Sequence, residues 1–106
     1  MYHLCFYVPE EAAEKVKEAV FATGAGRIGE YDACCWQTHG QGQFRPSAKA
    51  QPASGEKLQL NKVAELKVEM VCAAPLIKKA IRALIAAHPY EEPAYHYWKV
   101  QGLDDE

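Results

Sequence analysis

Side chains able to bind a ligand or move a proton gather in one short segment, His88-Pro89-Tyr90-Glu91-Glu92-Pro93. The histidine offers a proton-linked contact, the tyrosine a hydroxyl, and the glutamates negative charge. Pro89 and Pro93 lack an N–H and disfavour helical backbone at the residue before them, so the segment is predicted to be a stiff, extended corner. Such a corner can act as a rigid joint or as one side of a binding site, and both interpretations stay open. For His88 the alternatives are a helix-end histidine that caps carbonyl groups and packs against the apolar stripe, and a ligand or proton-linked contact.

A second polar segment, Gly40-Gln41-Gly42-Gln43-Phe44-Arg45-Pro46, precedes a long stretch without apolar periodicity. The Arg45 guanidinium, flanked by Phe44 and Pro46, could clamp a carboxylate or phosphate, or form an ion pair between subunits. The glycines do not match a phosphate-binding loop, because the downstream lysine and the strand-to-helix context are missing. The candidate ligand-binding residues are therefore His88, Tyr90, Glu91, Glu92, Arg45 and Phe44.

A divalent metal ion is the one cofactor that the chain's donor residues would suit. A metal site needs several converging ligands, and the candidates are His88, Glu91, Cys35 and His39. Cys35 and His39 could contribute only if the strand that carries them runs beside the corner. No CxxC spacing is present, so a structural zinc site is not expected.

No complete catalytic constellation occurs in the sequence. Ser47 and Ser54 lie in the aperiodic stretch with no histidine pattern nearby, and extended backbone would hold Cys35 and His39 roughly 13 Å apart along the strand. We therefore expect a protein that is not an enzyme. The remaining enzymatic alternative is a hydrolase that uses His88 and Glu91 as acid and base.

The elements that position these residues form two similar halves, each with a strand, a proline, a helix, a helix breaker and a second strand. Gly24 is the expected left-handed cap of the first helix, and the corner ends the second. Along the second helix and the strand before it, we expect nearly complete burial of Leu66, Val68, Ile77, Ile81, Leu84 and Ile85. The strands are expected at residues 2–8, 31–38, 62–72 and 94–100.

Two such halves build one α+β domain over residues 1–106, with the ferredoxin-like βαββαβ order. This fold has a four-stranded antiparallel sheet with two helices on one face. Residues 47–61 are expected to form a flexible surface loop, because their composition offers little to bury. The face without helices is expected to carry Tyr7, Tyr95 and Tyr97, and an uncovered aromatic face predicts self-association.

Composition limits the partners and the compartment. The net charge of −2 and the pI near 6.1 argue against nucleic acid as a main partner. No apolar run approaches the roughly 18 residues of a membrane span, and the N-terminus lacks a signal-peptide pattern, so a cytoplasmic protein is expected. The four cysteines, Cys5, Cys34, Cys35 and Cys72, are then expected to be buried free thiols.

Several motifs together give the chain a family resemblance. They are Val8-Pro9-Glu10, Gly24-Ala25-Gly26-Arg27-Ile28-Gly29 with Tyr31-Asp32, the Gly40 to Pro46 segment, and Ala87 to Tyr95. In this combination the chain resembles the domain inserted into many bacterial Nif-three-like proteins (the NGG-one-interacting-factor-three family). The corner also resembles that of the divalent-cation tolerance protein CutA, a trimeric relative of the PII signalling proteins. Cys34-Cys35-Trp36 departs from the pattern, which expects smaller polar residues there.

The resemblance implies a PII/CutA-like fold, a trimer and a regulatory or oligomer-forming role. The larger family members bind a two-metal centre in flanking lobes that this sequence does not contain. We therefore do not expect this chain to have a hydrolase activity on the basis of the resemblance. The function expected is a non-enzymatic, oligomeric sensor or adaptor that binds a small ligand or a protein partner at subunit clefts. The alternative is a divalent metal-binding protein of the CutA type.

Overall fold

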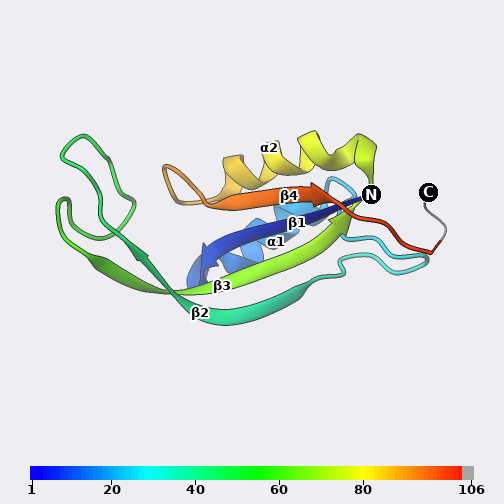
Figure 1. The fold of residues 1–106 in the computed structure, drawn as a ribbon, viewed down its shortest axis with the longest axis horizontal. Helices are drawn as coiled ribbons and strands as arrows, with labels where there is room; N and C mark the ends of the chain where they lie inside the picture. Colours follow the sequence, from blue (N-terminus) through cyan, green and yellow to red (C-terminus); the bar gives the residue numbers. More distant parts are fainter. Residues whose placement is uncertain (104–106) are drawn as a thin grey trace.

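A computed structural model describes residues 1–103 of the chain, and the acidic tail at 104–106 lies outside the described residues. The sheet order is β2-β3-β1-β4, and every pair of neighbouring strands is antiparallel. Both helices lie on one face of the sheet (Figure 1). The elements are β1 (Tyr2–Pro9), α1 (Ala13–Phe21), β2 (Trp36–Phe44), β3 (Asn61–Cys72), α2 (Ile77–Ala87) and β4 (Tyr95–Lys99), with short 3-10 helices at Glu10–Ala12 and Ala74–Leu76. This is the predicted ferredoxin-like arrangement.

The predicted repeat of strand, proline and helix is visible at the start of both helices. Pro9 ends β1, and Glu10 and Glu11 follow in the first turn, where the helix dipole favours negative charge. Pro75 occupies the corresponding turn before α2. Gly24 follows α1 with φ of 101°, a conformation that glycine adopts without strain, so the predicted left-handed cap is confirmed.

The hydrophobic core fills the space between the helices and the central strands β1 and β3. It is made mainly of Leu4, Phe6, Val8, Val16, Val20, Leu66, Val68, Met70, Ile77, Ala80, Ile81 and Leu84. The expected burial of Ile85 is wrong, because this side chain is 47% exposed. Each helical residue turns the side-chain direction by about 100°, which takes Ile85 from the buried stripe centred on Leu84 to its solvent edge.

The second strand differs from the predicted range 31–38. Residues before Trp36 form a turn instead, in which Ile28 and Tyr31 make an isolated bridge and Ala33 has φ of 53°. The strand then continues through Gly40 and Gly42 to Phe44, paired with β3 over its whole length. The twelve-residue β3 supplies a continuous pairing edge, and this outweighs the poor intrinsic strand preference of the glycines.

The expectation that Tyr95 and Tyr97 lie on the uncovered face is wrong. In the register of β1 with β4, Phe6 is opposite Tyr95 and Leu4 is opposite Tyr97. Residues directly opposite each other share a face, so both tyrosines lie on the helix side, where Tyr95 packs against the core. Tyr7 alternates with the core residues of β1 and is on the uncovered face, as expected.

The uncovered face has a different aromatic composition from the one predicted. Trp98 stacks on His3, with ring centroids 4.7 Å apart, and the His3 ring lies 3.0 Å from a carboxylate oxygen of Glu69. Cys5 is buried among its neighbours on this face.

All four cysteines are free thiols, as predicted, but only Cys5 and Cys72 are buried. The expected burial of Cys34 and Cys35 is wrong, because they lie in the turn before β2 and are partly exposed. No helix among residues 1–103 is long and apolar enough to cross a membrane.

Two strands extend beyond the body of the molecule. The pairing of β1 with β3 stops where Pro9 meets Glu65, so residues 41–44 and 61–64 continue as a two-stranded arm. The arm loop, residues 45–60, joins the strands at the tip and bends back towards the corner between α2 and β4 (Figure 1). The Gln51 N–H donates a 3.0 Å hydrogen bond to Glu91 and so links loop and corner.

Candidate functional site

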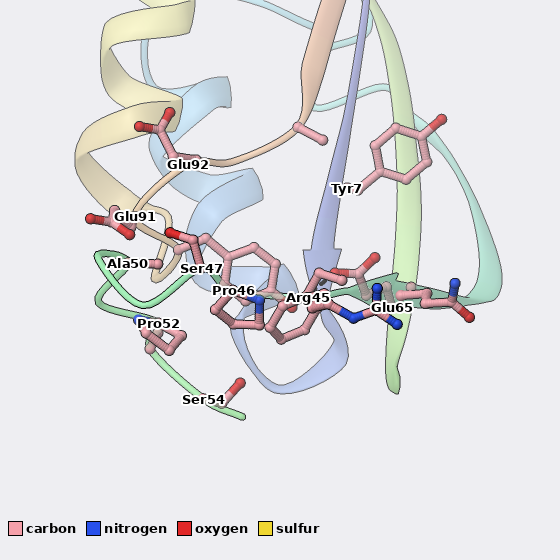
Figure 2. A pocket seen from close by; sticks show the side chains of 16 residues that line it. Tyr7, Arg45, Pro46, Ser47, Ala50, Pro52, Ser54, Glu65, Glu91 and Glu92 are labelled. Carbon is pink, nitrogen blue, oxygen red and sulfur yellow. Dashed lines mark hydrogen bonds between the residues drawn. The ribbon is translucent and has the colours of Figure 1, made fainter. Parts of the chain in front are cut away.

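A pocket of about 510 Å³ lies between the corner and the arm (Figure 2). Of the residues predicted to bind a ligand, Phe44, Arg45, Tyr90, Glu91 and Glu92 all line this corner–arm pocket, and His88 does not. The other lining residues are Tyr7, Gly42, Gln43, Pro46, Ser47, Ala50, Pro52, Ala53, Ser54, Glu65 and Ala94. Its volume is in the usual range for small-molecule sites.

His88 fixes the corner from beneath the pocket. Its backbone is extended because Pro89 follows, and its N–H still closes the last turn of α2 on Leu84 O at 2.9 Å. The ring Nε2 lies 2.7 Å from the carbonyl oxygen of Tyr7, so this nitrogen must carry the proton and donate it. The ring Nδ1 then accepts the N–H of Tyr90 at 3.1 Å.

These contacts define the protonation state of His88. The residue is 7% exposed, and burial lowers the pKa of its imidazole, although the hydrogen bond to Tyr7 opposes that shift. The neutral ring uses one nitrogen as donor and the other as acceptor, so neither is free for a ligand or a metal ion. In this arrangement His88 joins β1 to the corner and orients the backbone of Tyr90.

Tyr90 connects the corner to the arm. Its hydroxyl donates a 2.8 Å hydrogen bond to Glu65 Oε2, and its ring centroid is 6.4 Å from that of Phe44. Burial raises the pKa of Tyr90, and the hydrogen bond to Glu65 raises it further, so the hydroxyl stays protonated as a donor. Glu65 reaches this position across Gly42, where any Cβ atom would overlap its carboxylate.

Some charged side chains of the pocket have a hydrogen-bond partner in the protein, and Arg45 has no ion-pair partner among the described residues. Glu65 accepts the Tyr90 hydroxyl, and Glu91 accepts the Gln51 N–H. Within residues 1–103, the Arg45 guanidinium has no carboxylate oxygen within 4.0 Å. In Figure 2, Arg45 and Glu65 are on one side of the pocket, whereas Glu91 is on the other side, near Ala50 of the arm loop.

The structure does not bring the metal-ligand candidates together. His39 pairs with Glu10, with Nδ1 and Oε1 3.0 Å apart, and Cys35 packs against the core before β2 begins. The direction of β2 places Phe44, at its far end, in the pocket with Glu91. No group of three or more His, Cys, Asp or Glu side chains that could hold a metal ion occurs in the described part of the chain.

Sequence reasoning missed Tyr7, Glu65 and the arm-loop residues as parts of the pocket. Glu65 reads as an ordinary outward-facing residue of an alternating strand. A usable signal was present in Gly40 and Gly42, because glycines within a strand often mark the close approach of another group. The identity of that group depends on the register of β2 with β3, which the sequence pattern does not define.

Comparisons with known proteins agree with this fold. No family model matches the chain. A protein of Mycobacterium bovis named "GTP cyclohydrolase 1 type 2 homolog" is 47% identical over 89 residues, which cover 84% of this chain and 24% of the relative. The crystal structure of a Bacillus cereus protein related to NIF3 has a TM-score of 0.80 at 36% identity and covers 95% of this chain and 26% of that one.

A more distant solved structure has the same fold over most of its own length. The PII-like protein CutA from Nostoc has a TM-score of 0.67 at 18% identity, covering 94% of this chain and 81% of that one. Our chain thus spans about a quarter of the length of its NIF3-type relatives and most of the length of CutA. It is a PII/CutA-like domain of the kind present in the Nif-three-like proteins.

Proposed function

We propose that this PII/CutA-like domain is a non-enzymatic sensor or adaptor that binds a small molecule in the corner–arm pocket and works as a homo-oligomer. The observation that carries the proposal is the convergence of two distant segments on one pocket. Phe44 is the last residue of β2 and Arg45 follows it at the start of the arm loop, whereas Tyr90, Glu91 and Glu92 come from the corner, some 45 positions later. A pocket of this size with apolar walls and a few charged groups is typical of small-molecule sites.

The chemistry of the lining supports binding rather than turnover. Among the described lining residues there is no histidine or cysteine, and the nearby His88 has both ring nitrogens engaged. Ser47 and Ser54 line the pocket without the adjacent base that a serine nucleophile requires. The relatives' name refers to GTP cyclohydrolase, but this domain corresponds to only about a quarter of those proteins.

Self-association is supported by surfaces outside the pocket. Trp98 on the uncovered sheet face is 47% exposed, and Trp36 at the start of edge strand β2 is 71% exposed. Among residues 1–103, β2 and β4 are the edge strands of the sheet, and each has one edge that no described strand pairs with, which favours pairing with another chain. The resemblance to CutA suggests a trimer, which light scattering tests directly: a monomer at micromolar concentration would contradict this part of the proposal.

The proposed binding function is tested by thermal unfolding in the presence of a panel of nucleotides, amino acids and dicarboxylates. A ligand that binds only the folded state raises the melting temperature. We expect at least one such compound for the wild type, and the shift should disappear in Tyr90→Ala, which opens the wall between corner and arm. It should persist in the control Tyr31→Ala, whose side chain is exposed and outside the pocket.

Two results would contradict binding at this site. One is the absence of any stabilising compound in the panel, and the other is a shift that survives Tyr90→Ala unchanged. Divalent metal binding of the CutA type is the competing function. Metal analysis of the untagged protein would favour it if a stoichiometric ion were found.

A further inference from the structure

The corner–arm pocket contains both signs of charge, and this suggests its ligand class. We propose that the pocket selects zwitterionic small molecules in which an apolar body separates an anionic group from a cationic group. The anionic group pairs with Arg45, the apolar body lies along Phe44 and Pro46, and the cationic group faces Glu91. This inference rests on the proposed ligand-binding function and narrows it to one chemical class.

The anion-binding end is defined by Arg45. Its guanidinium lines the pocket and, within residues 1–103, has no carboxylate oxygen within 4.0 Å. The nearest acidic candidate on that side, Glu65, is instead held by the Tyr90 hydroxyl and by its position across Gly42. A planar guanidinium that is not paired with a protein carboxylate can donate two parallel hydrogen bonds to a carboxylate or phosphate.

The cation-binding end is defined by the corner. Glu91 uses one oxygen, Oε1, to accept the Gln51 N–H at 3.0 Å, and Glu92 adds a second negative charge to the same wall. Pro89 and Pro93 restrict the backbone of the corner, which bends at residues 89–92 instead of being extended throughout as predicted. The backbone that carries these carboxylates therefore loses little conformational freedom when a ligand binds. Figure 2 shows Glu91 across the pocket from Arg45, so one compact charged group cannot contact both.

Apolar side chains occupy the region between the two charged ends. Phe44 comes from the end of β2, Pro46, Ala50 and Pro52 come from the arm loop, and Ala94 directly precedes β4. Such walls favour an aromatic or aliphatic ligand body, whose burial supplies binding energy without requiring hydrogen bonds.

The balance of charge explains why both ligand groups are needed. Three carboxylates, on Glu65, Glu91 and Glu92, share the lining with the single guanidinium of Arg45, which leaves the empty pocket acidic. A purely anionic ligand would meet this excess of negative charge, and a purely cationic ligand would leave Arg45 unpaired. A ligand with both charges at the correct separation pairs both ends.

Three matched probes test the inference by titration calorimetry near pH 7. They are phenylpropanoate carrying a para-aminomethyl group, which is zwitterionic, phenylpropanoate carrying a para-methyl group, which is only anionic, and benzylamine carrying a para-propyl group, which is only cationic. We expect the zwitterion to bind about tenfold more tightly than either singly charged probe, since one charge-assisted hydrogen bond is lost in each case.

Variants that remove one charge from the pocket test which residue binds the anionic group of the ligand and which binds the cationic group. Arg45→Gln should weaken the zwitterion about tenfold without weakening the cationic probe, whereas Glu91→Gln should weaken the zwitterion without weakening the anionic probe. Glutamine at position 91 keeps a carbonyl oxygen for the Gln51 N–H, so the loop contact survives. Lys49→Gln and Glu56→Gln, exposed in the same loop and outside the lining, should change no affinity.

Equal affinity for the three probes, no binding of any of them, or a zwitterion affinity that neither charge variant changes would overturn the ligand class. If the broader panel then yields a compound whose stabilising effect is lost in Tyr90→Ala, the binding function stands and only the zwitterion assignment fails. If the panel yields none as well, both proposals fail together.

Discussion

The two ends of β3 belong to one continuous strand but have different surroundings. From Leu66 onwards every second residue of β3 is buried. Here β1 pairs with one edge of β3, and the two helices cover the sheet face on which these residues lie (Figure 1). Before Glu65 the strand pairs only with β2, and Ala64, which continues the same inward phase, is exposed. A strand's alternation therefore tells which residues share a face, whereas burial depends on elements elsewhere in the chain.

The core and the pocket are therefore stabilised by different interactions: burial of apolar side chains in the core, and a few hydrogen bonds in the pocket. The packed end of β3 belongs to a core whose largest side chains, such as Phe6 and Leu84, are fully buried. The arm end contributes to a pocket held by a few polar contacts, among them Tyr90 with Glu65 and Gln51 with Glu91. Because a hydrogen bond contributes only about 0.5–1.5 kcal/mol net, the pocket should be much easier to perturb without unfolding the domain.

The largest expected effect is on the core side. Leu84→Ala should lower the free energy of unfolding by about 2–5 kcal/mol, because it removes buried apolar surface and leaves a cavity between α2 and the sheet. Ile85→Ala, on the same helix but at an exposed site, should cost less than about 1 kcal/mol. Urea unfolding of both variants measures the difference, and similar losses would mean that the orientation of α2 is wrong.

The next effect concerns His88, which joins the core to the corner. His88→Ala removes the donor to Tyr7 O and the acceptor of the Tyr90 N–H, and we expect a loss of about 1–3 kcal/mol in urea unfolding at pH 7.5. The variant should also lose a specific pH dependence, because folding lowers the pKa of this imidazole below its ordinary value of 6.5.

The sign of that pH dependence follows from proton binding. As the pH falls below about 6.5, the unfolded chain gains a proton at His88 before the folded chain does, so stability is lost with decreasing pH. Above pH 6.5 the contribution is fully present. Unfolding free energies of wild type and His88→Ala should therefore converge as the pH is lowered towards 5, and a constant difference between them would refute the neutral-histidine assignment.

A smaller effect is expected at the contact between corner and arm. Tyr90→Phe removes only the hydroxyl that donates to Glu65, so it should cost about 0.5–1.5 kcal/mol. Gly42→Ala should disturb the same hydrogen bond from the other side, because its Cβ would displace the Glu65 carboxylate. If the double variant costs no more than the larger single change in urea unfolding, the two act on one contact; full additivity would show independent effects.

The smallest effect on global stability is expected in the arm loop. Limited proteolysis should cut first within residues 47–61, whose side chains are nearly all exposed and whose described link to the corner is a single exposed hydrogen bond. The nicked protein should unfold at nearly the same urea concentration, because the core does not involve this loop. First cleavage within α1 or α2, detected by mass spectrometry, would contradict the division between body and arm.

The fold was predictable from the sequence because its signals are local. The alternation of residues 62–72, the prolines before both helices and the glycine after the first one each act within a few positions. The phase of β4 was not predictable, since Tyr95 and Tyr97 alternate with equally large His96 and Trp98. Only the pairing with β1 determines which of these side chains meets the core.

The site was predictable in part for the same reason. The prolines and charges of the corner are clear in the sequence, and so is the unusual Phe44-Arg45-Pro46 triplet. Their meeting in one pocket depends on the length of the arm and on the bend of its loop, which are tertiary properties. The role of His88 stayed open between a structural contact and a ligand contact, because a histidine that holds two backbone groups looks in sequence like a histidine that holds a ligand.

The antiparallel pairing of β1 with β4 has a consequence for how this domain combines with others. Val100 N–H donates to Met1 O at 3.0 Å, so the chain enters and leaves the fold at the same place (Figure 1). A unit with adjacent entry and exit can be spliced into a surface loop of a host protein without stretching the host backbone. The same geometry makes the domain suited to circular permutation, with new ends opened in the arm loop and a short linker joining the old ones.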